Sequence, residues 1–131
     1  MTLEKKFLNL LKGNRNIKIT ESFGYGRRNF IINTLAAANK KPFILCDKAL
    51  CNIWIDLISK NNIDDFYISS QSLINFSGIN KPDFILIIDI EIIHSLVDIT
   101  TLDSIKKHFE RVVHLYNSGD IDLNLEAIIL V

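Results

Sequence analysis

The sequence predicts an α/β domain, a three-layer sandwich in which helices cover both faces of a mainly parallel sheet. Apolar segments of strand length alternate along the chain with helical segments of about ten residues, an order that indicates strand–helix–strand crossovers. The segment 84–88, Phe-Ile-Leu-Ile-Ile, is apolar without interruption, as expected of a strand that is buried on both faces. The 131 residues suit one domain spanning 1–131, and a hydrophobic content of 48% is sufficient for its core.

Helices are predicted where apolar residues recur at three- and four-residue intervals. They cover residues 2–12, 29–39, 50–60 and 102–110. The first is expected to stop at Gly13 and the third at Asn61-Asn62. The residues predicted to face the core are Leu3, Phe7, Leu10 and Leu11 in the first helix, Ile31, Leu35 and Ala38 in the second, Leu50, Ile53, Trp54, Leu57 and Ile58 in the third, and Leu102, Ile105 and Phe109 in the fourth.

Strands are predicted at 17–20, 43–46, 66–69, 84–88, 112–116 and 127–131. Because crossovers between parallel strands are right-handed, the carboxyl ends of these strands are expected at one edge of the sheet, where ligands bind in such folds. The residues predicted to gather at that edge are Glu21–Arg28, Asp47, Ser69, Ser70, Asp89, Tyr116 and Asn117.

The charge and hydropathy patterns exclude several classes of protein. Fifteen basic and fifteen acidic residues balance, so a nucleic-acid partner would have to bind a local basic patch. The longest apolar stretch, 84–93, contains Asp89 and Glu91 and is too short to span a bilayer. Charged residues near the N-terminus argue against a signal peptide, so a cytoplasmic protein with no membrane association is expected.

The two cysteines do not indicate a metal site. Cys46 and Cys51 lack a second Cys or His pair that would complete a zinc site. Both are therefore expected to be reduced and to act as small apolar residues. Abundant isoleucine and asparagine are typical of an AT-rich genome, such as that of a virus, a phage or an AT-rich bacterium.

A glycine-rich loop, Phe-Gly-Tyr-Gly-Arg-Arg-Asn at 23–29, joins the first strand to the next helix. Such a loop lets backbone amides approach a phosphate, and the helix N-terminus adds partial positive charge. A dinucleotide fingerprint would need a third glycine at Asn29, although Asp47 stands where such proteins hold a ribose. A simple turn with two solvated arginines is the structural alternative. In a phosphate-binding loop, the binding residues would be Gly24, Gly26, Arg27 and Arg28.

From residue 17 onward, the segments of the chain resemble, in order, the first ATPase lobe of superfamily 2 helicases, a P-loop NTPase domain of the RecA-like type. The glycine loop matches the family's Gly-x-Gly-Lys-Thr, with Arg27 and Arg28 at the lysine and threonine positions. The other matching segments are Phe43–Asp47 with Leu50 and Trp54, Phe66–Leu73, the Walker B-like Lys81–Asp89 with Glu91 and His94, and Arg111–Asn117.

The resemblance implies an ATP and Mg²⁺ site that has lost essential groups. Asp89 occupies the position of the metal-binding carboxylate, but Ile90 stands where the family has its catalytic glutamate, and Glu91 is the nearest substitute. An arginine at position 28 offers only donors and a positive charge, so it would repel the metal that the family's threonine binds. We therefore expect little or no ATP hydrolysis. If the protein were active, Asp89 and Glu91 would be its catalytic residues.

These observations leave three hypotheses. The leading one is a catalytically impaired helicase-like module of viral or phage type that binds nucleic acid or protein through Arg27, Arg28, Ser69, Ser70 and Asn117, without a required cofactor. The second is a divergent Mg²⁺-dependent nucleotide hydrolase. The third is a purely structural docking subunit of a larger assembly, which includes a possible oligomer.

Overall fold

The computed structural model describes residues 3–12, 17–20, 26–70, 81–89, 107–115 and 127–130. Its helices are α1 (Leu3–Lys12), α2 (Gly26–Ala37), the short 3-10 helix η1 (Lys48–Leu50) and α3 (Cys51–Lys60). Its strands are β1 (Ile17–Thr20), β2 (Lys41–Cys46), β3 (Tyr67–Ser69), β4 (Lys81–Asp89), β5 (Phe109–Leu115) and β6 (Ala127–Leu130). Every strand predicted from the sequence is present, with bounds that differ by at most three residues.

The six strands form one parallel sheet in the order β3-β2-β4-β5-β1-β6. The prediction of an α/β fold with a parallel sheet is therefore confirmed. β1 lies between β5 and β6, and β4 and β5 separate it from β2. In the doubly wound fold that binds dinucleotides, with the order 3-2-1-4-5-6, the first strand is a neighbour of the second. The strand that precedes the glycine loop thus has different neighbours in this protein.

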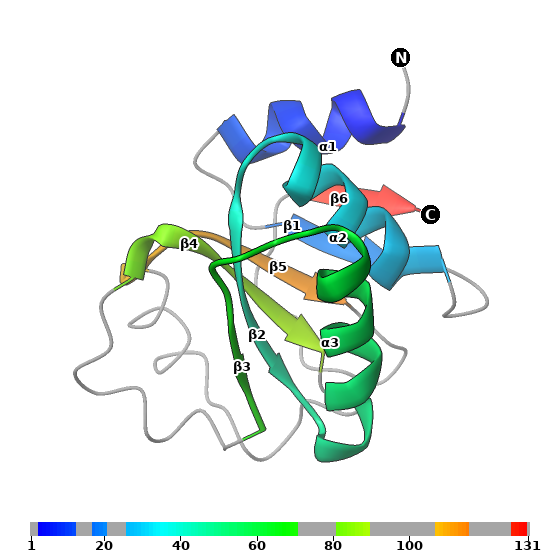
Figure 1. Ribbon diagram of the computed structural model, residues 1–131. Helices are drawn as coiled ribbons and strands as arrows, with labels where there is room; N and C mark the ends of the chain where they lie inside the picture. The colour runs from blue at the N-terminus through cyan, green and yellow to red at the C-terminus, as the bar shows by residue number, and fades with distance from the viewer. Residues whose placement is uncertain are drawn as a thin grey trace.

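The three α-helices form one layer against the sheet (Figure 1). In this layer α2 packs against α1 on one side and against α3 on the other. Because side chains alternate along a strand, every second strand residue faces these helices. The core between the helices and the sheet consists of Phe7, Leu11, Ile17, Ile19, Ile31, Ile32, Leu35, Ile44, Cys46, Trp54, Ile58, Ile85, Ile87, Val113 and Leu115.

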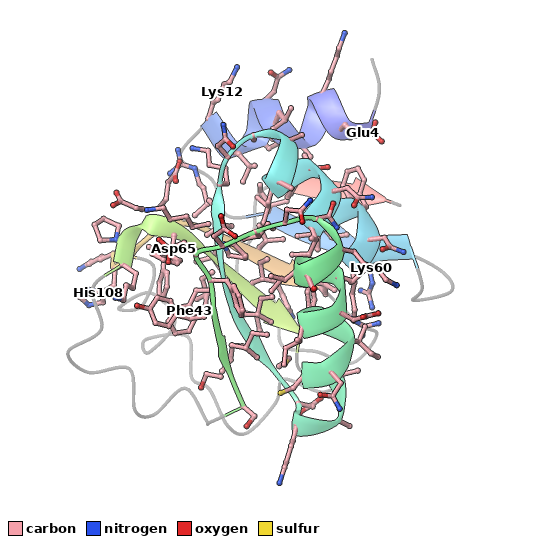
Figure 2. All side chains as sticks on the ribbon, in the orientation of Figure 1. Glu4, Lys12, Phe43, Lys60, Asp65 and His108 are labelled. Carbon is pink, nitrogen blue, oxygen red and sulfur yellow. The ribbon has the colours of Figure 1, made fainter. Side chains whose placement is uncertain are left out.

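The opposite face of the central strands is buried as well. Leu45, Leu86 and Ile88 are fully buried, and Phe43 projects from β2 on the side away from α3 (Figure 2). All residues from Phe84 to Asp89 are buried, as the uninterrupted apolar run predicts. The described helices cover one face only, so the three-layer arrangement depends on residues outside the described ranges. No helix within those ranges is both long and apolar enough to cross a membrane.

Two asparagines end the helices that pack on the sheet. Asn39 follows α2 with φ of 54°, and Asn62 follows α3 with φ of 55°. The next amide in each case donates back to the last helical turn, from Lys40 N to Leu35 O at 2.9 Å and from Ile63 N to Ile58 O at 3.2 Å. Asparagine adopts this left-handed conformation more readily than most residues. This bend takes the chain from α2 directly into β2, which begins at Lys41.

The predicted inward faces of α1 and α3 are confirmed at their centres but not at one border. Phe7, Leu11, Trp54 and Ile58 are all at most 2% exposed. Ile53, which was predicted to face the core, is 46% exposed. Successive helical residues are about 100° apart, and the buried stripe of α3 is centred on Trp54 and Ile58. Ile53 therefore lies outside the stripe.

Two predicted helices differ from the structure by more than one residue. The second, α2, begins at Gly26, three residues before the predicted start, and Ala38 lies beyond its end. The fourth was predicted over 102–110, but residues 107 and 108 form a turn and Phe109 already belongs to β5. Phe109 is buried and its ring packs edge-on against Phe43 at 5.2 Å, so sheet packing determines its conformation. Residues 102–106 lie outside the described ranges.

Candidate functional site

The carboxyl ends of the strands meet at one edge of the sheet, as predicted, and the start of α2 lies beside them. Cys46, the last residue of β2, is the register partner of Asp89, the last residue of β4. The chain continues at Asp47, whose amide lies 3.4 Å from the Asp89 carbonyl oxygen. Two of the predicted edge residues, Asp47 and Asp89, are therefore adjacent.

Asp89 is the centre of a buried hydrogen-bonded group that we call the Asp89 site, consisting of Arg28, Trp54 and Asp89. Arg28 donates from Nε to Asp89 Oδ2 at 2.7 Å and from a terminal nitrogen to Oδ1 at 3.3 Å. Trp54 donates from its indole nitrogen to the same Oδ2 at 2.8 Å. The side chain of Asp89 is 2% exposed and that of Arg28 is 18% exposed. The carboxylate thus receives charge-assisted bonds on both oxygens, as a buried charge requires.

The alternation of β4 and the positions on two helices explain this convergence. Asp89 has the same parity as Ile85 and Ile87, so it points to the face of the sheet covered by α2 and α3. Arg28 lies in the first turn of α2, and Trp54 lies on the inward stripe of α3. The first turn of α2 contains no acidic residue, although anions are favoured near a helix N-terminus. Asp89 supplies that negative charge from the neighbouring strand.

Arg27, the second predicted phosphate-binding arginine, is directed elsewhere. It is 4% exposed, and one terminal nitrogen lies 3.3 Å from the carbonyl oxygen of Ile19 in β1. The first turn of α2 therefore sends one arginine toward the end of β1 and the other toward the end of β4. The structure brings Arg27 and Arg28 close to the sheet edge, but with both guanidinium groups bonded to the protein itself.

The other predicted site residues are placed as follows. Gly26 is exposed and begins α2. Ser69 ends β3 and pairs in register with Leu45, and Ser70 follows it and is exposed. Since β2 lies between β3 and β4, these serines are two strand spacings, about 10 Å, from the Asp89 site. Gly24, Glu91 and Asn117 lie outside the described residues.

The two cysteines are also at this edge. Cys46 Sγ and Cys51 Sγ are 3.6 Å apart, and both cysteines are free. Burial is the main cause that raises the pKa of Cys46 to about 12, followed by the hydrogen bond and charge of Cys51 and by the charges of Asp89 and Asp47. At neutral pH the Cys46 thiol is therefore protonated, and it is no nucleophile in the resting site.

The surroundings of Asp89 do not fit the Mg²⁺ ion that the helicase resemblance implies. Mg²⁺ requires oxygen ligands in octahedral geometry at about 2.0–2.1 Å, whereas a guanidinium and an indole N–H already lie against the carboxylate. In the part of the chain that the structure describes, no three His, Cys, Asp or Glu side chains are grouped so that they could hold a metal ion. The arrangement compensates the charge of a buried carboxylate and fixes its orientation.

Sequence reasoning identified Asp89 and Arg28 but missed that they bind each other, and it assigned Trp54 to the core alone. The sequence contained a signal for the Arg28–Asp89 contact and one for the hydrogen bond of Trp54. The resemblance aligns Arg28 with a residue that shares a metal ion with the carboxylate at position 89, so the two positions are expected to be neighbours. A buried tryptophan also requires an acceptor for its N–H.

Comparisons with known proteins do not add to this geometry. No family model matches the chain, and searches of curated proteins and of solved structures gave no match.

Proposed function

We propose that this chain is a helicase-like domain that does not hydrolyse ATP and that acts as an accessory module by binding a partner, with single-stranded nucleic acid as the first candidate. The observation that carries the proposal is the ion pair of Arg28 with Asp89. A positively charged side chain occupies the place beside the carboxylate where a hydrolytic domain of this type would need a divalent cation.

The energetics of the Asp89 site support a permanent pair. To bind Mg²⁺, Asp89 would have to release Arg28 and the Trp54 N–H, which would break the ion pair of a partly buried guanidinium with Asp89. Breaking a buried ion pair in this way costs about 3–5 kcal/mol. Bringing the dication near Arg28 would add repulsion between like charges. Both costs oppose metal-dependent hydrolysis at this edge.

The strand order supports the phosphate-loop interpretation over the dinucleotide one. The strand before the glycine loop, β1, is not a neighbour of β2, as it would be in a dinucleotide-binding fold. Asp47, which would hold the ribose in that fold, lies instead beside the Asp89 backbone, as the 3.4 Å amide contact shows. We propose on this basis that the domain is of the RecA-like type.

The binding surface that we propose is the carboxyl edge of the sheet. Its exposed polar groups among the described residues include Gly26, Asn29, Lys48 and Ser70. The resemblance places the end of β3, at Ser69 and Ser70, against a nucleic-acid backbone. The net charge is zero, so nucleic-acid binding would depend on local contacts with the phosphates. Contacts of this kind weaken strongly when salt is added.

The proposal is tested by assaying purified protein for ATP turnover with Mg²⁺, and by titrating labelled single-stranded DNA and RNA at low and moderate salt. We expect no turnover above the level of the Asp89→Asn variant, and salt-sensitive binding of the oligonucleotides. Glu110→Gln serves as a matched control that removes a carboxylate far from the edge. Mg²⁺-dependent turnover that is lost in Asp89→Asn but kept in Glu110→Gln would show a hydrolase and refute the proposal. Absence of oligonucleotide binding would refute the nucleic-acid partner.

A further inference from the structure

The cysteine pair beside the Asp89 site has a geometry that the proposed function does not use. Cys46 ends β2, Cys51 begins α3, and only Asp47 and η1 lie between them. Their sulfur atoms are 3.6 Å apart. A disulfide requires about 2.05 Å between sulfurs, so the two sulfur atoms lie in contact and must move closer together to form the bond.

The two thiols differ in their contacts and in their exposure. The Cys51 sulfur lies 3.8 Å from the carbonyl oxygen of Asp47, to which its proton can be donated. Either thiol can donate in the contact between the two sulfurs. The two thiols also differ in access, because Cys46 is 2% exposed whereas Cys51 is only partly buried.

We propose that Cys46 and Cys51 form a reversible dithiol–disulfide site that is oxidised by small-molecule disulfides of the glutathione type. The proposal is independent of the function proposed above. It adds a site of covalent chemistry to an edge at which the sequence predicts only two inert, reduced thiols.

The reaction proceeds by two exchanges. The thiolate of Cys51, the accessible cysteine, attacks one sulfur of the small disulfide, and the displaced thiolate leaves and takes up a proton. Cys46, as a thiolate, then attacks the Cys51 sulfur of this mixed disulfide and displaces the second small thiolate, which also takes up a proton. Two protein thiols are oxidised to one disulfide, and one small disulfide is reduced to two thiols.

The environment of Cys46 makes the second exchange the slow one. Burial is the main cause that raises the pKa of Cys46 to about 12 in the dithiol, and burial also acts in the mixed disulfide, so the thiolate fraction at neutral pH is small. Ring closure is therefore expected to accelerate by nearly tenfold for each unit of pH between about 7 and 9, because the thiolate fraction rises in this proportion.

The molecule contains its own reporter of this reaction. Trp54 is the only tryptophan of the chain, is fully buried, and lies one helical turn after Cys51 in α3. A disulfide quenches tryptophan fluorescence at short range. Closure between Cys46 and Cys51 would also tie α3 to the end of β2, next to the residue that Trp54 binds.

The test uses the wild-type protein equilibrated with mixtures of reduced and oxidised glutathione, acid-quenched, and analysed by mass spectrometry without reduction. We expect a monomer that is lighter by two hydrogen atoms, and a peptide map that links Cys46 to Cys51. Trp54 fluorescence should fall with the same midpoint and recover when reductant is added. A wild-type protein that keeps both thiols, that accumulates a stable glutathione adduct, or that forms mainly a disulfide-linked dimer would overturn the proposal.

Two serine variants distinguish the steps. Cys46→Ser should stop at one glutathione on Cys51, a product whose added mass distinguishes it from the internal disulfide. Cys51→Ser should react far more slowly, because the one cysteine that this variant keeps, Cys46, is buried. If Cys51→Ser takes up glutathione as fast as Cys46→Ser, the assigned order of attack is wrong. Should the Cys46 variant fail to fold, the mass and peptide map of the wild-type product still decide the proposal.

Discussion

Two ion pairs join the two ends of α2 to the sheet. They have similar distances but differ in burial and in the other partners of the carboxylate. At the start of the helix, Arg28 contacts Asp89 at 2.7 Å. Just beyond its end, Lys40 contacts Glu110 of β5 at 2.5 Å. The first pair is nearly enclosed, with side chains 18% and 2% exposed, whereas those of the second are 33% and 27% exposed.

Burial and partners, more than separation, are expected to determine what each ion pair contributes to stability. Water screens the Lys40–Glu110 pair and can replace either member. At the Asp89 site the carboxylate has a third donor in Trp54 and is almost inaccessible to solvent. Removing one member there takes a bonded charge away from the other in a poorly polarisable environment. The shorter contact is therefore expected to be the weaker one.

The largest effect is expected for Asp89→Asn. The substitution keeps the shape of the side chain but removes the charge that compensates Arg28, so the free energy of unfolding should fall by about 3 kcal/mol. Urea unfolding followed by circular dichroism measures the loss. The double variant Arg28→Met/Asp89→Leu, which removes both charges, should recover part of the stability. A loss as small as that of a surface pair would show that the site is not the buried anchor described here.

A smaller effect is expected for Trp54→Phe. Phenylalanine fills most of the same space but cannot donate to Asp89, so one of the bonds to a buried carboxylate is lost. Hydrogen bonds to charged groups contribute about 1.5–3 kcal/mol to stability. We expect the free energy of unfolding, measured by urea titration, to fall by about 2 kcal/mol. Since the variant lacks tryptophan, the measurement is made by circular dichroism. Equal losses in Asp89→Asn and in Trp54→Phe/Asp89→Asn would mean that the indole acts only through Asp89.

Features that depend on local sequence could be predicted, whereas features that depend on tertiary packing could not. Ile17–Thr20 was predicted with the bounds that β1 has, and the buried run in β4 was identified, because both depend on local hydropathy. The parallel sheet followed from the alternation of strands and helices. Phe109 was misassigned to a helix because its conformation depends on packing against Phe43 of another strand.

The Asp89 site illustrates the limit most clearly. Arg28 and Asp89 are 61 residues apart in sequence, and their meeting depends on α2 crossing from β1 over the sheet toward β4. Periodicity gives the face on which Asp89 lies, but not the strand order that brings a particular helix turn above it. Each residue was therefore recognised as polar and important, while the bond between them was not.

The smallest effect is expected for Glu110→Gln at the other end of α2. Its partner Lys40 remains partly solvated when the carboxylate is removed, so no buried charge is left uncompensated. The free energy of unfolding should fall by less than about 1 kcal/mol. Because salt screens exposed charges within a Debye length of about 10 Å at 0.1 M, the difference between wild type and variant should shrink further when the urea titration is repeated in high salt. The loss in Asp89→Asn should change much less with salt, since its ion pair is enclosed. If both variants lost stability equally and with the same salt dependence, burial would not be what distinguishes the two ends of α2.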